Sequence, residues 1–150
     1  MHPHEELLRR LFHHLAAREA QGMRHCYHPE IFYTNPLVPR ARGPQAFEAW
    51  EAIFEELPDL HIALRRVEAD ADGGVAHWHA SYTFRGRRVE HEVRSMFAFR
   101  RGLVCRHYDH FSLWRWLAQA LGPAGLALGW FGPFRWALRQ RAARRLERLS

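Results

Sequence analysis

Lysine is absent from this chain of 150 residues, and all 22 of its basic residues are arginine. With 16 acidic residues the formal net charge is +6, which in general favours acidic partners. The arginines are dispersed, so we attribute their excess to compositional bias and do not expect nucleic acid as a partner. A run of 18 apolar residues is also lacking, and this argues against a membrane-spanning helix.

Cysteine is scarce as well. Cys26 and Cys105 lie far apart without the spacing of metal ligands, so we expect buried thiols in a cytoplasmic protein. The opening residues, MHPHEELLRR, carry charge too early for a secretory signal. There is no glycine-rich phosphate loop and no nucleophile elbow, and the pair His77 and His79 has no obvious third ligand. We therefore predict neither a cofactor nor a bound metal.

The apolar content is sufficient for one domain with a core, since 47% of the residues are hydrophobic and 13% are aromatic. Apolar residues recur first at helical spacing and then, from about residue 60, in alternation. The expected helices are 4–20, 23–29, 44–57 and 112–121, with an extended loop over 30–44. The expected strands are 60–69, 75–84, 89–99 and 103–111. This order predicts an α+β fold in which N-terminal helices pack on a curved antiparallel sheet.

An aspartate in the last predicted strand, in CRHYDHF at 105–111, needs an explanation because aspartate is rare in strands. A type I turn with Gly102 as a bulge would pair Val93 with Asp109 and place Asp109 on the apolar face. A two-residue turn would instead place Asp109 beside Arg94 on the charged face. We favour the bulge because it keeps Phe111 inside.

On this prediction Asp109 is a carboxylate in an aromatic-lined hollow, which is costly unless the group is paired or serves a site. Its expected companions on the inner face are His107, Cys105 and Phe111, with His91 diagonal to it. Two roles stay open. Asp109 is either a general acid or base, or a structural carboxylate bonded to Tyr33, His107 or a helix terminus.

Three stretches carry a family resemblance: CYHPEIFYTNP, VAHWHASYTFRGRRVE and FAFRRGLVCRHYDHFSLWRW. They resemble the SnoaL-like branch of the nuclear transport factor 2-like superfamily, which includes polyketide cyclases and is related to limonene-epoxide hydrolases and ketosteroid isomerases. The likeness covers roughly residues 5–121. It implies a cone-shaped domain over 1–121, with 122–150 as a C-terminal helical extension.

The resemblance implies a catalytic carboxylate inside the cone, and Asp109 stands at the position of the family's aspartate. Epoxide hydrolases add an Arg-x-Asp pair on an earlier strand, but residues 75–84 contain no acidic residue, which argues against that activity. Ketosteroid isomerases use a tyrosine in an oxyanion hole, for which Tyr33 and Tyr82 are candidates. Asn35 stands where relatives place a polar residue at the mouth of the cone.

Two functions remain open from the sequence. The first is binding of a hydrophobic small molecule with cofactor-free acid–base catalysis, as an isomerase, cyclase, dehydratase or hydrolase. The second is a non-catalytic ligand carrier or dimeric interaction module. An open interior favours the first and an interior filled by aromatic side chains favours the second. The candidate catalytic residues are Asp109 and His91, and the candidate binding residues are Tyr33, Asn35, Trp50, Trp78, Tyr82, Phe97, His107 and Phe111.

Charges of both signs on the other face of the predicted sheet favour a homodimer through that face. It carries His77, His79, Glu90, Glu92, Arg94, Arg106, Tyr108 and His110, with an apolar patch of Met96, Ala98 and Val104. The C-terminal sequence RWALRQRAARRLERLS and the aromatic residues before it have the pattern of a basic amphipathic helix. Contact of 130–150 with a membrane is one interpretation, and we favour packing against the domain or a dimer partner.

Overall fold

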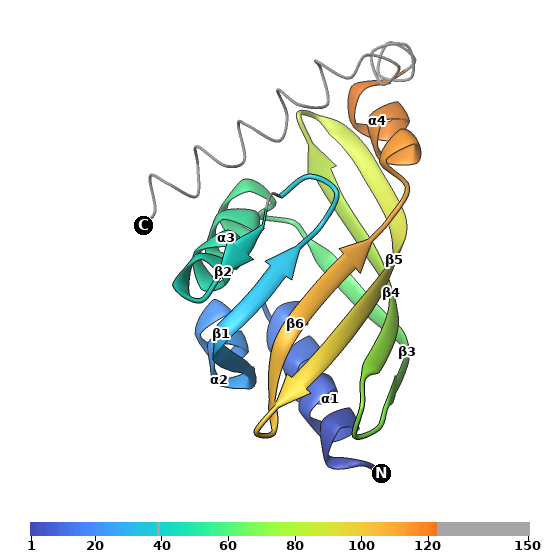
Figure 1. Ribbon diagram of the computed structural model, residues 1–150. Helices are drawn as coiled ribbons and strands as arrows, with labels where there is room; N and C mark the ends of the chain where they lie inside the picture. Colours follow the sequence, from blue (N-terminus) through green and yellow to red (C-terminus); the bar gives the residue numbers. More distant parts are fainter. Residues whose placement is uncertain (39, 123–150) are drawn as a thin grey trace.

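The computed structural model describes residues 1–38 and 40–122. Figure 1 shows α1, α2 and α3 on one face of a curved sheet, with α4 near the start of β5. The α+β fold predicted from the sequence is confirmed. Most of the predicted extension, residues 123–150, lies outside the described range. Within residues 1–38 and 40–122, no helix is long and apolar enough to cross a membrane. The helices are α1 (Pro3–Ala16), α2 (Ala20–Cys26), α3 (Pro44–Glu56) and α4 (Leu113–Leu121).

Six strands form one sheet in the order β2-β1-β6-β5-β4-β3, with β1 and β6 parallel and every other pair antiparallel. The meander predicted from the sequence corresponds to β3 through β6. The loop predicted over 30–44 is wrong for its first part, because β1 occupies it. The strands are β1 (Tyr27–Thr34), β2 (Ala41–Arg42), β3 (His61–Ala69), β4 (Gly74–Phe84), β5 (Arg87–Arg100) and β6 (Leu103–His110).

The helices bury regular apolar stripes against the concave face of the sheet. In α1, Leu8, Leu11 and Leu15 are completely buried, and His2 caps the helix by accepting a hydrogen bond from the amide of His4. In α3 the corresponding stripe includes Trp50. The stripes and the inner face of the sheet form one continuous core. This core encloses the polar residues described below.

The β5–β6 hairpin has a two-residue turn and, separately, a bulge. Arg101 and Gly102 both have positive φ, and Arg100 pairs with Leu103, as in a type I′ turn. The register then shifts between Ala98 and Phe99, which leaves Cys105 as an extra residue. The predicted three-residue turn is therefore wrong. The bulge at Cys105 nevertheless places the later residues of β6 on the predicted faces of the sheet.

The bulge decides which side chains of β6 enter the core. Val104 is completely buried, whereas Cys105 is half-buried and lies on the outer face; the sequence prediction had these two reversed. Beyond the bulge the predicted faces hold. Asp109 is buried on the inner face, 7% exposed, but it lies opposite Ser95 and not Val93.

Candidate functional site

The polar centre of the cone is Asp109, which receives three hydrogen bonds from three other side chains. Ser95 Oγ on β5 lies 2.5 Å from Asp109 Oδ1, and His107 Nε2 on β6 lies 2.8 Å from the same oxygen. Tyr33 Oη on β1 donates to Asp109 Oδ2 at 2.8 Å. Since β1 and β5 flank β6 in the sheet, Tyr33 and Ser95 reach the carboxylate from the two neighbouring strands, and His107 reaches it from its own strand.

Groups that can only donate fix the direction of two of these bonds. The Trp78 indole donates to Ser95 Oγ at 2.7 Å, so the Ser95 proton is free to point at Asp109. The Asn35 amide nitrogen donates to Tyr33 Oη at 3.0 Å, so Tyr33 likewise directs its own proton to the carboxylate. Each hydroxyl thus accepts one bond and donates one, and both chains end on Asp109.

The third chain fixes the tautomer of a buried histidine. The Trp50 indole donates to Tyr27 Oη at 2.9 Å, and Tyr27 Oη lies 2.8 Å from His107 Nδ1. Tyr27 therefore donates to Nδ1, which must carry a lone pair. The proton of neutral His107 is then on Nε2 and points at Asp109.

All donors of the network are satisfied when Asp109 is ionised and its tyrosines are neutral. Burial, with the Asp109 charge as the next cause, raises the pKa of Tyr27 and of Tyr33 well above the ordinary value. Both phenols therefore remain hydrogen-bond donors across the physiological pH range. The Asp109 side chain is only 4% exposed, so its carboxylate has lost most of its hydration. Three hydrogen bonds from protein donors replace those from water. One of its four acceptor positions, on Oδ2, has no donor among the described residues.

A second polar cluster lies farther along β4 and β5, beside α4. The Trp116 indole donates to Tyr82 Oη at 2.7 Å, so Tyr82 directs its proton to His91 Nε2 at 3.0 Å. This leaves the His91 proton on Nδ1. Among the residues that the structure describes, Nδ1 is buried and forms no hydrogen bond of good geometry, although the backbone of Glu92 lies near the ring. The ring lies against Phe111 with centroids 4.6 Å apart.

The environment of His91 keeps this histidine neutral. Burial, reinforced by the nearby His79, lowers the pKa of His91 to about 4. At neutral pH the ring therefore presents an uncharged N–H group. A buried donor without a partner costs roughly 1–3 kcal/mol.

The loop after β1 holds Asn35 in place. Its Oδ1 accepts hydrogen bonds from the amides of Leu37 and Val38 at 2.7 and 2.6 Å, in the manner of an Asx turn. The side chain consequently directs its nitrogen toward Tyr33. Asn35 thus links the loop to the Asp109 network.

The residues predicted as site residues divide between the two clusters. The sequence pattern suggested that His91 pairs with Asp109, but in the structure these two residues form no hydrogen bond. The histidine that bonds to Asp109 is His107, and the register of β5 and β6 differs from the predicted one. Tyr33, Asn35, Trp50, Trp78 and His107 join the Asp109 network, Phe97 packs on His107 with centroids 4.6 Å apart, and Tyr82 and Phe111 contact His91.

Three members of these clusters were missed from the sequence. Ser95 was placed on the inner face, but the incorrect register hid its contact with Asp109. Tyr27 lies in a segment predicted as helix, and it begins β1. Trp116 is in α4, whose position relative to Tyr82 no local pattern reveals.

Aromatic side chains fill the space around the Asp109 network. Trp50, Trp78, Phe97 and Phe111 are between 2% and 8% exposed. Across residues 1–38 and 40–122, His, Cys, Asp and Glu form no group of three that could hold a metal ion. The polar side chains of the two clusters comprise a carboxylate, a serine hydroxyl, imidazoles and phenols.

A curved sheet with three helices on its concave face and an inward-facing carboxylate defines a cone of the nuclear transport factor 2 type. Residues 8–107 match the SnoaL-like domain family, and the chain belongs to that family. No curated protein matches the sequence.

Solved structures share this fold at low sequence identity. A putative SnoaL-like polyketide cyclase from Jannaschia sp. CCS1 superposes with a TM-score of 0.71 at 18% identity, covering 81% of this chain and 93% of the other. An epoxide hydrolase from M. tuberculosis, described as LEH-like, gives 0.68 at 15% identity, covering 84% and 93%. TerC, co-crystallised with polyporic acid, gives 0.65 at 18% identity, covering 73% and 92%. These similarities concern the fold.

Proposed function

We propose that this protein binds a hydrophobic small molecule inside the cone and performs acid–base chemistry on it without a cofactor. The observation that carries the proposal is the buried Nδ1–H of His91, which forms no hydrogen bond of good geometry among the described residues. A carbonyl or hydroxyl oxygen of a ligand lying against Phe111 would accept this bond. The ligand then replaces a missing interaction, which supports affinity and orientation.

Asp109 is the proposed general base. Its carboxylate accepts three hydrogen bonds, and the fourth acceptor position, on Oδ2, would take a ligand proton if the ligand displaces the side chains packed around it. Its proposed substrates are therefore molecules with an acidic C–H or O–H group near the oxygen that His91 binds. Isomerisation, cyclisation and dehydration include such a proton transfer, and in a hydrolysis the base would instead take the proton of the attacking water.

A second candidate is a non-catalytic ligand carrier or dimeric interaction module of the same fold. Two observations favour it. The centre is closely packed, with His107, Tyr33 and Ser95 fully buried and the Asp109 side chain 4% exposed. Aromatic side chains also fill the space around the network, which is the arrangement expected for this function. In that function the Asp109 network serves stability and specificity of the core. The two candidates differ in whether a substitution at Asp109 affects turnover.

Ligand binding is tested with probes that differ only in their acceptor group. Naphthalene and 2-acetonaphthone share an aromatic body, and polyporic acid is a further probe because it was co-crystallised with TerC. We expect the ketone to raise the melting temperature more than the hydrocarbon. His91→Gln should weaken ketone binding about tenfold, the loss of roughly one hydrogen bond. His77→Gln, an exposed histidine on the outer face, is the control. Equal ketone affinity of His91→Gln and His77→Gln would contradict the proposal, and so would equal affinity of the wild type for naphthalene and 2-acetonaphthone.

A further inference from the structure

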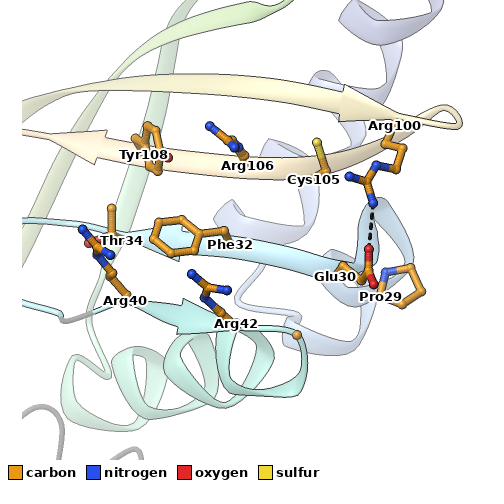
Figure 2. Close-up of a pocket in the computed structure, with 11 residues that line it drawn as sticks. Pro29, Glu30, Phe32, Thr34, Arg40, Arg42, Arg100, Cys105, Arg106 and Tyr108 are labelled. Carbon is orange, nitrogen blue, oxygen red and sulfur yellow. Dashed lines mark hydrogen bonds and ion pairs between the residues drawn. The ribbon is translucent and has the colours of Figure 1, made fainter.

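A pocket lies on the outer face of the sheet, on the side opposite the cone interior. It extends across β2, β1 and β6 and has a volume of about 910 Å³. Figure 2 shows Phe32 and Tyr108 side by side on its floor, with arginine side chains around them. This volume lies within the range of small-molecule sites, about 300–1,000 Å³. None of the polar groups of the Asp109 network lines it.

The strand register explains why arginines and aromatic rings alternate here. Phe32 on β1 lies opposite Arg42 on β2 and opposite Arg106 on β6. Two residues farther along both strands, Thr34 lies opposite Tyr108. Side chains that share a face of a sheet recur every second residue, so these groups project from the same surface. The rings of Phe32 and Tyr108 meet edge to face with centroids 5.8 Å apart.

The positive charge of the pocket is largely uncompensated. The guanidinium groups of Arg40 and Arg42 lie 5.9 and 5.3 Å from the centroid of Phe32. Arg40, Arg42 and Arg106 have no carboxylate partner in the described part of the chain. Only Arg100 is paired, with Glu30 at 2.7 Å. A concave surface with three unpaired guanidinium groups concentrates anions.

We propose that this pocket is a second binding site, separate from the cone, for a small aromatic molecule that carries two or more carboxylate or phosphate groups. The aromatic body packs on Phe32 and Tyr108. The acidic groups form charge-assisted, bidentate bonds with the guanidinium groups, a geometry that arginine provides and lysine does not. The pocket is bounded by the Arg100–Glu30 pair at one end, so a compact ligand fits it better than a polymer does.

Cys105 supplies a reporter inside the pocket. The bulge in β6 places its thiol among the lining side chains, whereas the other cysteine, Cys26, is 3% exposed in the core. Alkylation by neutral iodoacetamide should therefore label Cys105 first. A ligand in the pocket slows that reaction, and mass spectrometry of the two cysteine peptides measures it.

The probe is benzene-1,3,5-tricarboxylate. It should slow alkylation of Cys105 at least about fivefold at saturation, and benzene-1,3,5-trimethanol, its neutral counterpart, should not. Citrate, which has three carboxylates and no ring, should need a several-fold higher concentration. Arg106→Gln should raise the half-protecting concentration about tenfold, since one charge-assisted hydrogen bond is lost. Arg94→Gln removes the same charge from the same face outside the pocket and should change it less than about twofold.

Four results would overturn the proposal. Protection by trimethanol equal to that by the tricarboxylate would remove the role of charge, and equal protection by citrate would remove the role of the ring. Stronger protection by a dT12 oligonucleotide would identify a nucleic-acid surface. Slower alkylation at higher protein concentration, with no probe added, would identify an interface between copies of this chain. These outcomes concern the outer face and leave the proposal for the cone to its own test.

Discussion

Ser95 and Asp109 lie directly opposite each other on β5 and β6, and Ser95 Oγ is 2.5 Å from Asp109 Oδ1. Because Ser95 also accepts the proton of Trp78, one hydroxyl satisfies both a buried indole and a buried carboxylate. The pair is therefore a point at which stability and the proposed chemistry meet.

Removing that hydroxyl should destabilise the protein. Ser95→Ala leaves the Trp78 N–H without an acceptor and removes one donor from Asp109, so we expect a loss of about 2–3 kcal/mol in the free energy of unfolding. Ser81→Ala is the matched control, because Ser81 is also a buried strand serine, 4% exposed, and its hydroxyl forms no hydrogen bond with another side chain among the described residues. Denaturant unfolding of both variants measures the difference. Equal losses would show that the network contributes nothing beyond packing.

Asp109→Asn tests the role of the carboxylate. The amide nitrogen would face a hydrogen-bond donor where an oxygen now accepts, so we expect a loss of about 1–3 kcal/mol in stability. If Asp109 is the base, turnover of a probe substrate should also fall about 10²–10⁴-fold. Unchanged turnover with lowered stability would contradict the catalytic role and favour the ligand carrier.

His91 should make stability depend on pH in a defined window. Its folded-state pKa of about 4 lies below the ordinary value of 6.5, so the unfolded chain binds the proton more tightly. The contribution is complete above pH 6.5 and is lost as the pH falls toward 4. In the wild type this titration should lower the free energy of unfolding by up to about 3 kcal/mol, and in His91→Gln this part of the pH dependence should be absent. Unfolding free energies of wild type and His91→Gln, measured from pH 4 to 8, give the difference. His77→Gln should retain the wild-type profile.

The dimer face predicted from the sequence also included Arg106, Tyr108 and His110. Because Arg106 and Tyr108 line the pocket, we limit the predicted homodimer contact to the β4–β5 part of the outer face. Glu90, Glu92 and Arg94 alternate there, and Met96 is 44% exposed beside them. Light scattering at micromolar concentration should give twice the monomer mass for the wild type. For Arg94→Glu the measured mass should fall toward that of the monomer. Arg9→Glu, on α1, is the control, since that helix lies on the other face of the sheet. A monomeric wild type would contradict this prediction.

The elements that the sequence predicted well are those with local patterns. The stripe of Leu8, Leu11 and Leu15 identifies α1, and alternation identifies β3 through β6. β1 was missed because its support is a parallel pairing with β6, more than seventy residues later in the chain. Pro29 within it further weakens any strand pattern.

The candidate site was predicted less completely than the fold. Asp109 was assigned to the correct face, because the pattern of Phe111 and its neighbours requires it. Two of its partners, Tyr33 and His107, were among those named from the sequence. Ser95 was not, since the two-residue turn and the bulge at Cys105 together shift the pairing of Asp109 from Val93 to Ser95, and alternation does not encode the bulge. The two tyrosines of the network, Tyr27 and Tyr33, belong to the strand that was not recognised.

The donor-only groups that end each chain of the Asp109 network have a consequence for proton conduction. A relay to solvent needs members that can both take up and release a proton, but the chains end at the indoles of Trp78 and Trp50 and at the amide of Asn35. A proton that Asp109 removes from a ligand therefore has no exit along these bonds. In the proposed chemistry it must return to the same molecule, so the arrangement suits a rearrangement of one ligand better than a reaction with a net release of acid.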